Sequence, residues 1–157
     1  MSQAAVLEAG TTGSVIAEDV APDFHTWGLA GCIYRLTEPL RQEGAGVRLE
    51  TPHHGIEVPA TSAALLYRAG QEILTNTFRH SRATEVTVRL EAVYHGIRLT
   101  ITDNGIGFNP EHQGLASRDH GYGVCLMTMA VHEAGGTITT DSAPGRGTRV
   151  SITLPLD

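Results

Sequence analysis

Asp103-Asn104-Gly105-Ile106-Gly107-Phe108 comes directly after a run in which apolar and polar residues alternate, a pattern that predicts a strand. A carboxylate at the end of such a strand can accept a hydrogen bond from the exocyclic amine of a purine. Gly105 and Gly107 lack a β-carbon, so the backbone there can come close to a bound molecule. An Asn-Gly step is also an ordinary turn. Taken alone, the stretch leaves both a nucleotide site and a simple turn open.

Upstream of this stretch, residues 61–80 predict a long amphipathic helix, capped by Thr61 or Ser62. Its expected apolar face comprises Leu65, Leu66, Ile73, Leu74 and Phe78. At about 100° per residue, a polar stripe runs beside that face and contains Glu72, Asn76, Arg79 and His80.

This polar stripe has the chemistry of a site wall. The amide oxygen of Asn76 is a suitable ligand for Mg²⁺, and Glu72 could hold a metal-bound water or accept a proton. Arg79 and His80 could donate hydrogen bonds to phosphate oxygens. A solvated helix face would show the same pattern, so the helix alone does not decide between the two.

The rest of the chain predicts strands and helices in two layers. Strands are expected at residues 47–51, 86–90, 97–101, 137–140 and 148–154, with a hairpin turn at His95-Gly96. Helices are expected at residues 27–42, where Pro39 would kink or end the helix, and at 121–134, before Gly135-Gly136. Residues 1–26 are weakly patterned, which predicts a loose lead followed by one domain at 27–157. This arrangement predicts an α+β two-layer sandwich.

Composition narrows the class of protein. The net charge of -6 and the absence of a basic block argue against nucleic-acid binding. Cys32 and Cys125 lie far apart in the chain, as expected for free thiols in a reducing cytoplasm. No signal peptide and no apolar run of membrane-spanning length is found. The chain is therefore expected to be an acidic, soluble, cytoplasmic domain.

Other motifs are weaker. Gly121 and Gly123 open a predicted helix, where backbone N–H groups attract phosphate, although a plain loop-to-helix junction would look the same. Thr148 follows a predicted hairpin turn and could direct a hydroxyl at the site. A P-loop motif is absent, and Gly105 and Gly107 do not open a helix as a Rossmann site requires. The eight histidines lack metal-ligand spacing, which argues against structural zinc.

The order of these motifs resembles that of sensor histidine kinases. Residues 71–80 followed by Ala83 resemble the asparagine box of that family. Residues 103–108 resemble its first glycine box and residues 121–123 its second, while residues 135–155 resemble its closing hairpin. Tyr67-Arg68 and the short loop between the glycine boxes resemble the nitrate-sensor and lipid-thermosensor subfamily. The resemblance covers residues 28–156.

The resemblance implies a Bergerat ATP-binding fold, with a mixed, mostly antiparallel sheet and helices on one face. ATP and Mg²⁺ would bind under a mobile lid at residues 109–120. At the phosphate end, the resemblance implies that Asn76 is a Mg²⁺ ligand and that Glu72 acts through a metal-bound water or as a base. It further implies phosphate contacts for Arg79 and His80 and a phosphate-side hinge at Gly121 and Gly123. At the adenine end, the implied contacts are Asp103, Gly105, Gly107 and Thr148.

The implied reaction is transfer of the γ-phosphate of ATP to a histidine of a dimerisation domain, with a response regulator downstream. None of the eight histidines has the setting of that acceptor, so it is expected on another chain or in a missing part. The usual Gly-Met-Arg-Glu-Arg run after the second glycine box is replaced by Leu126-Met-Thr-Met-Ala130. An anti-sigma-factor serine kinase and a non-catalytic nucleotide-binding or docking module are the alternatives.

Overall fold

Five strands form a single sheet in the computed structural model, which describes residues 22–52, 57–109 and 121–156. The strand order is β1-β2-β3-β5-β4. The strands are β1 (Gly46–Glu50), β2 (Glu85–Val93), β3 (Gly96–Asp103), β4 (Thr137–Ser142) and β5 (Thr148–Pro155). β1 runs parallel to β2, and all other neighbours are antiparallel. The mixed, mostly antiparallel sheet that the family resemblance implied is confirmed.

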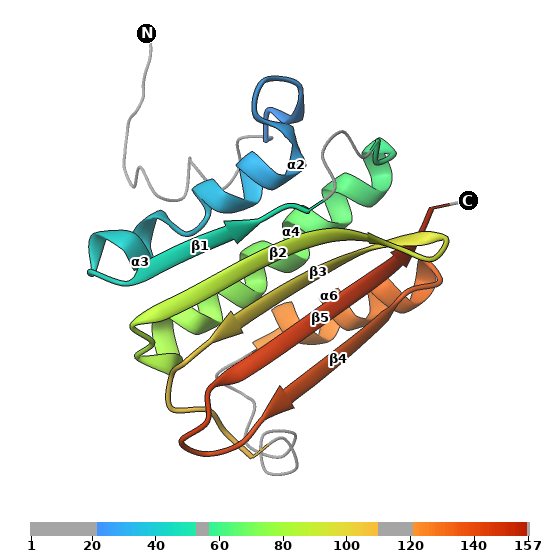
Figure 1. The fold of residues 1–157 in the computed structure, drawn as a ribbon. Coiled ribbons are helices and arrows are strands. Elements are labelled where there is room, and N and C mark those ends of the chain that lie inside the picture. Colours follow the sequence, from blue (N-terminus) through green and yellow to red (C-terminus); the bar gives the residue numbers. More distant parts are fainter. Residues whose placement is uncertain (1–21, 53–56, 110–120, 157) are drawn as a thin grey trace, which may run out of the picture.

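Helices cover one face of this sheet. Figure 1 shows α2 (Phe24–Arg35), α4 (Ala60–Asn76) and α6 (Gly121–Glu133) on the same side. The core lies between the two layers and is built from alternate strand residues and from the inner faces of the helices. Its fully buried large side chains include Val86, Val88, Leu99, Ile101 and Ile152 from the strands and Ile33, Leu66 and Val131 from the helices. The α+β two-layer sandwich is therefore confirmed.

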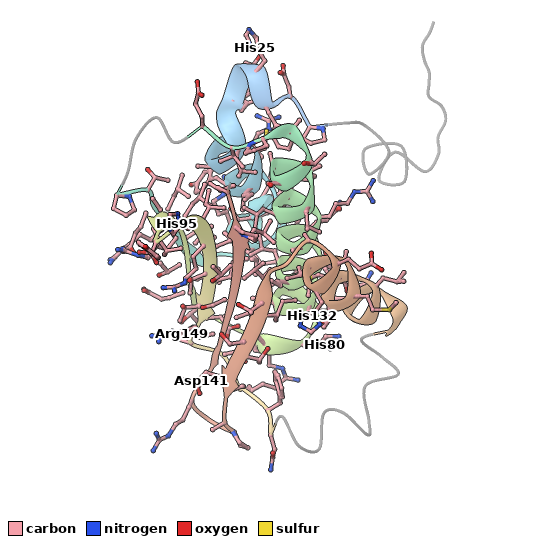
Figure 2. All side chains as sticks on the ribbon, turned by 90° about the vertical axis from the view of Figure 1, so that its right-hand side faces the viewer. His25, His80, His95, His132, Asp141 and Arg149 are labelled. Carbon is pink, nitrogen blue, oxygen red and sulfur yellow. The ribbon has the colours of Figure 1, made fainter. Side chains whose placement is uncertain are left out.

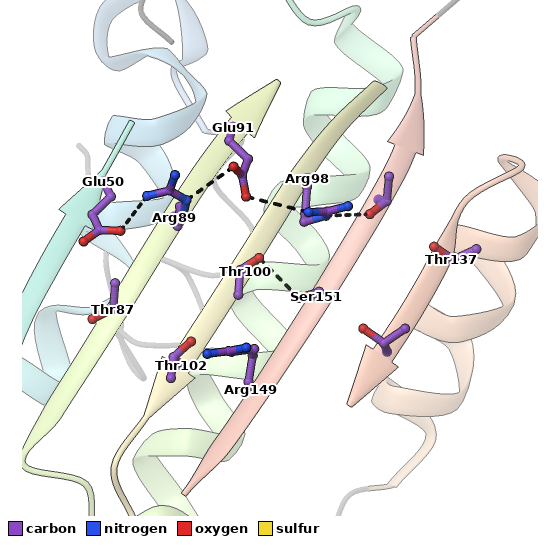
Figure 3. Close-up of a pocket in the computed structure, with 12 residues that line it drawn as sticks. Glu50, Thr87, Arg89, Glu91, Arg98, Thr100, Thr102, Thr137, Arg149 and Ser151 are labelled. Atoms are coloured by element: carbon purple, nitrogen blue, oxygen red, sulfur yellow. Dashed lines mark hydrogen bonds and ion pairs between the residues drawn. The ribbon is translucent and has the colours of Figure 1, made fainter. Parts of the chain in front are cut away.

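The opposite face of the sheet is polar. Figure 3 shows a row of charged contacts across three strands: Glu50 of β1 contacts Arg89 of β2 at 2.9 Å, Arg89 contacts Glu91 of the same strand at 3.4 Å, and Glu91 contacts Arg98 of β3 at 4.0 Å. Threonine and serine side chains and Arg149 make up the rest of this surface, and the hydroxyls of Thr100 and Ser151 lie 3.2 Å apart. Cross-strand pairs of this kind stabilise a solvated sheet face. Asp103, by contrast, belongs to the alternate β3 positions that face the helices.

The first predicted helix is divided into two. α2 ends at Arg35, and α3 (Glu38–Gln42) begins one turn later with Pro39 in its first turn, where proline is tolerated. The prediction of one helix over residues 27–42 is wrong. The break falls just before Pro39, the residue that was expected to kink or end this helix. α2 also starts at Phe24, where the Asp23 carboxylate accepts a hydrogen bond from the Thr26 amide at 3.0 Å. Residues 1–21 of the predicted lead lie outside the described part.

The helix predicted at residues 61–80 also differs in its ends. α4 begins after Pro59, and no side chain caps it, so the predicted caps Thr61 and Ser62 are wrong. A π-helical turn, η1 (Thr77–Ser81), continues α4. Because a π turn holds more residues than an α turn, side chains beyond Asn76 rotate away from the predicted positions. Phe78, expected in the core, is 44% exposed, while Thr77 and Ser81 are buried.

The remaining elements follow the sequence closely. α6 ends before Gly135, whose φ of 82° suits glycine, and the Gly136 amide donates to the Val131 carbonyl at 2.8 Å. The hairpins β2–β3 and β4–β5 lie where they were expected. Within the described ranges, no helix is both long enough and apolar enough to cross a membrane. Of the predicted lid at residues 109–120, only Asn109 is described.

Candidate functional site

Asp103 ends β3 in the middle of the sheet, between Val86 of β2 and Thr148 of β5. Its side chain is 7% exposed, and one carboxylate oxygen, Oδ1, accepts a hydrogen bond from the Gly105 amide at 2.8 Å. Burial raises the pKa of the carboxyl, against the lowering effect of backbone hydrogen bonds from Gly105 and Thr148. The result is a fixed acceptor at the rim of the core, suited to hold a hydrogen-bond donor of a ligand.

Asn104 fastens the start of the loop, a role that the sequence interpretation missed. Its Oδ1 accepts hydrogen bonds from the amides of Thr84 and Glu85, both at 2.9 Å. Its Nδ2 donates to the Thr84 hydroxyl oxygen, also at 2.9 Å. Asparagine commonly bonds nearby backbone in turns, but these partners lie about 20 residues away in the chain, so local sequence could not name them.

The two glycines of the loop allow protein backbone to pack on protein backbone. A β-carbon on Gly105 would collide with the Ser81 carbonyl oxygen. A β-carbon on Gly107, which has a φ of 67°, would collide with the Ala143 carbonyl oxygen. The sequence interpretation assigned both glycines to close approach of a ligand; the structure gives a reason for them within the fold itself.

The β4–β5 turn closes the other side of the loop. The Thr148 hydroxyl lies 2.8 Å from the Ser142 hydroxyl, which accepts from the Phe108 amide at 2.9 Å and donates to the Gly147 carbonyl at 2.9 Å. Ser142 was also missed, because its partners are brought together only by the turn. Thr148 thus lies beside Asp103, as the pairing of β3 with β5 requires.

The predicted polar stripe divides between two elements. Glu72 and Asn76 lie on the last turns of α4 and are half-buried, whereas Arg79 and His80 lie on η1 and are exposed. The end of η1 reaches the Asp103 loop, where the Ile106 amide donates to the Ser81 carbonyl at 2.8 Å. The structure thereby joins the helix motif to the first glycine motif.

Gly121 and Gly123 form the first turn of α6, and their backbone is helical as predicted. α6 contacts both α4 and β4. Figure 2 shows His25 at one end of the molecule, His95 near the middle, and His132 and His80 towards the opposite end. Among the described residues, no group of three or more His, Cys, Asp or Glu side chains could hold a metal ion.

Comparisons with known proteins place this chain in a family. Residues 61–157, more than half of the chain, match the family of histidine kinase-, DNA gyrase B-, and HSP90-like ATPases. The chain therefore belongs to this ATPase family, and ATP is its expected nucleotide.

The individual relatives include a sensor histidine kinase and a sensor protein. The sensor histidine kinase LiaS of Bacillus subtilis is 37% identical over 91 residues, which are 58% of this chain and 24% of LiaS. The sensor protein VraS of Staphylococcus epidermidis is 39% identical over 101 residues, which are 64% of this chain and 28% of VraS. The chain thus spans about a quarter of the length of these relatives. The narrower subfamily named above remains a prediction.

Solved structures agree on the fold. A blue-light activated histidine kinase of Erythrobacter litoralis has a TM-score of 0.66 at 22% identity, covering 82% of this chain and 42% of that one. Its histidine kinase domain has a TM-score of 0.63 at 21% identity, covering 82% of this chain and 59% of that one. At this identity the likeness shows the fold alone.

Proposed function

We propose that this chain is the ATP-binding catalytic domain of a sensor histidine kinase, which transfers the γ-phosphate of ATP to a histidine of a dimerisation domain. The observation that carries the proposal is the 37–39% identity to a sensor histidine kinase and a sensor protein over 91 and 101 residues, together with the ATPase family match at residues 61–157. A response regulator would receive the phosphoryl group afterwards. A domain that uses ATP and carries the free thiol of Cys32 fits the cytoplasm best.

In this proposal the Asp103 loop is the adenine end of the site. The buried carboxylate accepts a hydrogen bond from the adenine amine, and its backbone hydrogen bonds keep it fixed before ATP arrives. Because the acceptor is already fixed, little conformational entropy is lost when the base binds. The site therefore favours a base that donates a hydrogen bond at that position. Thr148 contributes from the neighbouring strand, and Gly105 and Gly107 keep the loop in place.

The phosphate end is assigned to α4, η1 and the start of α6. Asn76 and Glu72 offer oxygen atoms one helical turn apart, and both are half-buried at the end of α4. A single amide and one carboxylate suit Mg²⁺, which keeps several waters and binds mainly through substrate phosphates. When bound, the ion supplies neutralisation of phosphate charge. Arg79 and His80 would contact phosphate oxygens, and Gly121 and Gly123 would let them approach the α6 backbone.

Binding of a fluorescent ATP analogue, with and without Mg²⁺, tests the site. Asp103→Asn is expected to weaken binding by about 1.5–3 kcal/mol, because it replaces a charged acceptor. Glu133→Gln is a matched control: it removes a carboxylate charge from an exposed position at the last residue of α6, at the opposite end of that helix from Gly121. Asn76→Asp is expected to change Mg²⁺-ATP binding more than adenosine binding. Equal affinities in wild type and all three variants would contradict the site assignment.

The transfer itself needs an acceptor. Incubation with Mg²⁺-ATP and a dimerisation domain from a related sensor kinase is expected to give acid-labile, base-stable phosphate on that partner. One feature favours a non-catalytic nucleotide-binding module instead: Thr128 and Ala130 of α6 stand where the family pattern has charged residues. Normal ATP binding without transfer to any partner histidine would support that second candidate.

A further inference from the structure

Ser81 is the residue at which η1 meets the Asp103 loop. Its hydroxyl donates to the Thr77 carbonyl at 2.8 Å and accepts from the Ala83 amide at 3.1 Å. The side chain is 8% exposed, so these two bonds satisfy a hydroxyl that water hardly reaches. The hydroxyl of Ser81 therefore links Thr77, the first residue of η1, to Ala83, which follows its end.

The backbone of Ser81 contacts the loop at the same time. Its carbonyl accepts from the Ile106 amide at 2.8 Å. Its carbonyl oxygen and β-carbon occupy the space that a side chain at Gly105 would need. The close approach of the two segments at this point therefore requires glycine at position 105.

We propose that Ser81 is a positioning residue, which sets the phosphate-binding turn at a fixed place relative to the adenine-binding loop. The inference rests on the proposed function, since it takes the Asp103 loop as the adenine end and residues 76–80 as the phosphate end. The hydroxyl of Ser81 stabilises the turn that carries Arg79 and His80, through its hydrogen bond to the Thr77 carbonyl. The carbonyl of Ser81 stabilises the Asp103 loop, through the hydrogen bond from the Ile106 amide. One residue therefore fixes the spacing between the two ends of the nucleotide site.

This division between hydroxyl and carbonyl makes the role testable. Ser81→Ala removes the hydroxyl bonds to Thr77 and Ala83 but keeps the carbonyl bond to Ile106. The phosphate end is expected to loosen while the adenine end keeps its shape. In titrations, Mg²⁺-ATP affinity is expected to fall roughly tenfold, the effect of about one buried hydrogen bond, with adenosine affinity changed less than about twofold.

Thr37→Val is the matched control. The Thr37 hydroxyl is also buried and also makes two hydrogen bonds, donating to the Tyr34 carbonyl at 2.6 Å and accepting from Arg41 Nε at 3.0 Å. Thr37 lies between α2 and α3, outside α4, η1 and the Asp103 loop, so loss of its hydroxyl is expected to lower stability while leaving the ratio of Mg²⁺-ATP to adenosine affinity as in the wild type. Ser81→Cys keeps the volume with a weaker donor and replaces Ser81→Ala if that variant does not fold.

The outcomes separate this inference from the proposed function. A selective loss of Mg²⁺-ATP affinity in Ser81→Ala, absent from Thr37→Val, supports the positioning role. Equal losses for adenosine and Mg²⁺-ATP, no loss for either, or a selective loss in both variants would overturn it. A wild-type protein that binds neither ligand would instead contradict the proposed function.

Discussion

Asp103 is expected to reduce stability at neutral pH, because burial raises the pKa of its carboxyl above the ordinary value of 3.8. At pH values between the pKa of the unfolded chain and the higher pKa of the folded chain, the folded chain binds more protons. The free energy of unfolding therefore falls as the pH rises through that range. Below it both states are protonated and the cost disappears.

Asp103→Asn removes the buried charge and is therefore expected to raise the free energy of unfolding at pH 7. This gain should shrink as the pH falls towards about 4. Urea unfolding of both proteins across this range measures the difference. A variant that is less stable than the wild type at pH 7 would show that the acceptor bonds outweigh the cost of burial.

Arg82 adopts a strained backbone conformation. It is exposed and follows η1 with a φ of 56°, in the left-handed region that residues with a β-carbon rarely adopt. Arg82→Gly is expected to stabilise the fold by up to about 1 kcal/mol, measured by chemical denaturation. Arg82→Ala keeps the β-carbon while removing the charge, so it should show no such gain. Equal effects of the two substitutions would assign the change to charge.

Among the helices, α4 was predictable and η1 was not. The apolar period of residues 61–76 places Leu66, Ile73 and Leu74 against the sheet, and the structure buries all three. Continuing the same period through residue 80 placed Phe78 in the core. The π turn arises where the Thr77 and Ser81 hydroxyls bond earlier carbonyls and where Ser81 packs on a loop far along the chain. A helical period contains none of that information.

The contact between η1 and the loop gives a third prediction. Gly105→Ala is expected to destabilise the fold by about 1–3 kcal/mol, because its β-carbon meets the backbone of Ser81, which cannot move aside without moving η1. Gly145→Ala is the control, since that glycine has a φ of 79° but nothing within 4 Å of an added β-carbon. Denaturation should give the larger loss for Gly105→Ala. The reverse order would show that backbone conformation, not packing, limits this region.

Across the molecule, the sheet and its helices follow from local patterns, whereas the site depends on contacts between distant segments. Alternation fixes which strand residues face the core, and glycines mark the turns, so the two-layer sandwich was predictable. Hydrogen bonds of three residues connect the segments of the site, namely η1, the Asp103 loop and the β4–β5 turn: Ser81, Asn104 and Ser142. In the sequence, each of the three looks like an ordinary turn residue. Their partners become known only once the strands are paired.

Because three distant segments meet at this one site, a nucleotide bound there should stabilise the whole domain. A ligand at about 100 times its dissociation constant adds about 2.7 kcal/mol to the free energy of unfolding. For a chain of this size, that corresponds to a rise in Tm of roughly 5–10 °C. Saturating Mg²⁺-ATP should produce this rise in a thermal melt, and Asp103→Asn should show a smaller one at the same concentration. An unchanged Tm with saturating nucleotide would mean that ATP does not bind preferentially to the folded domain.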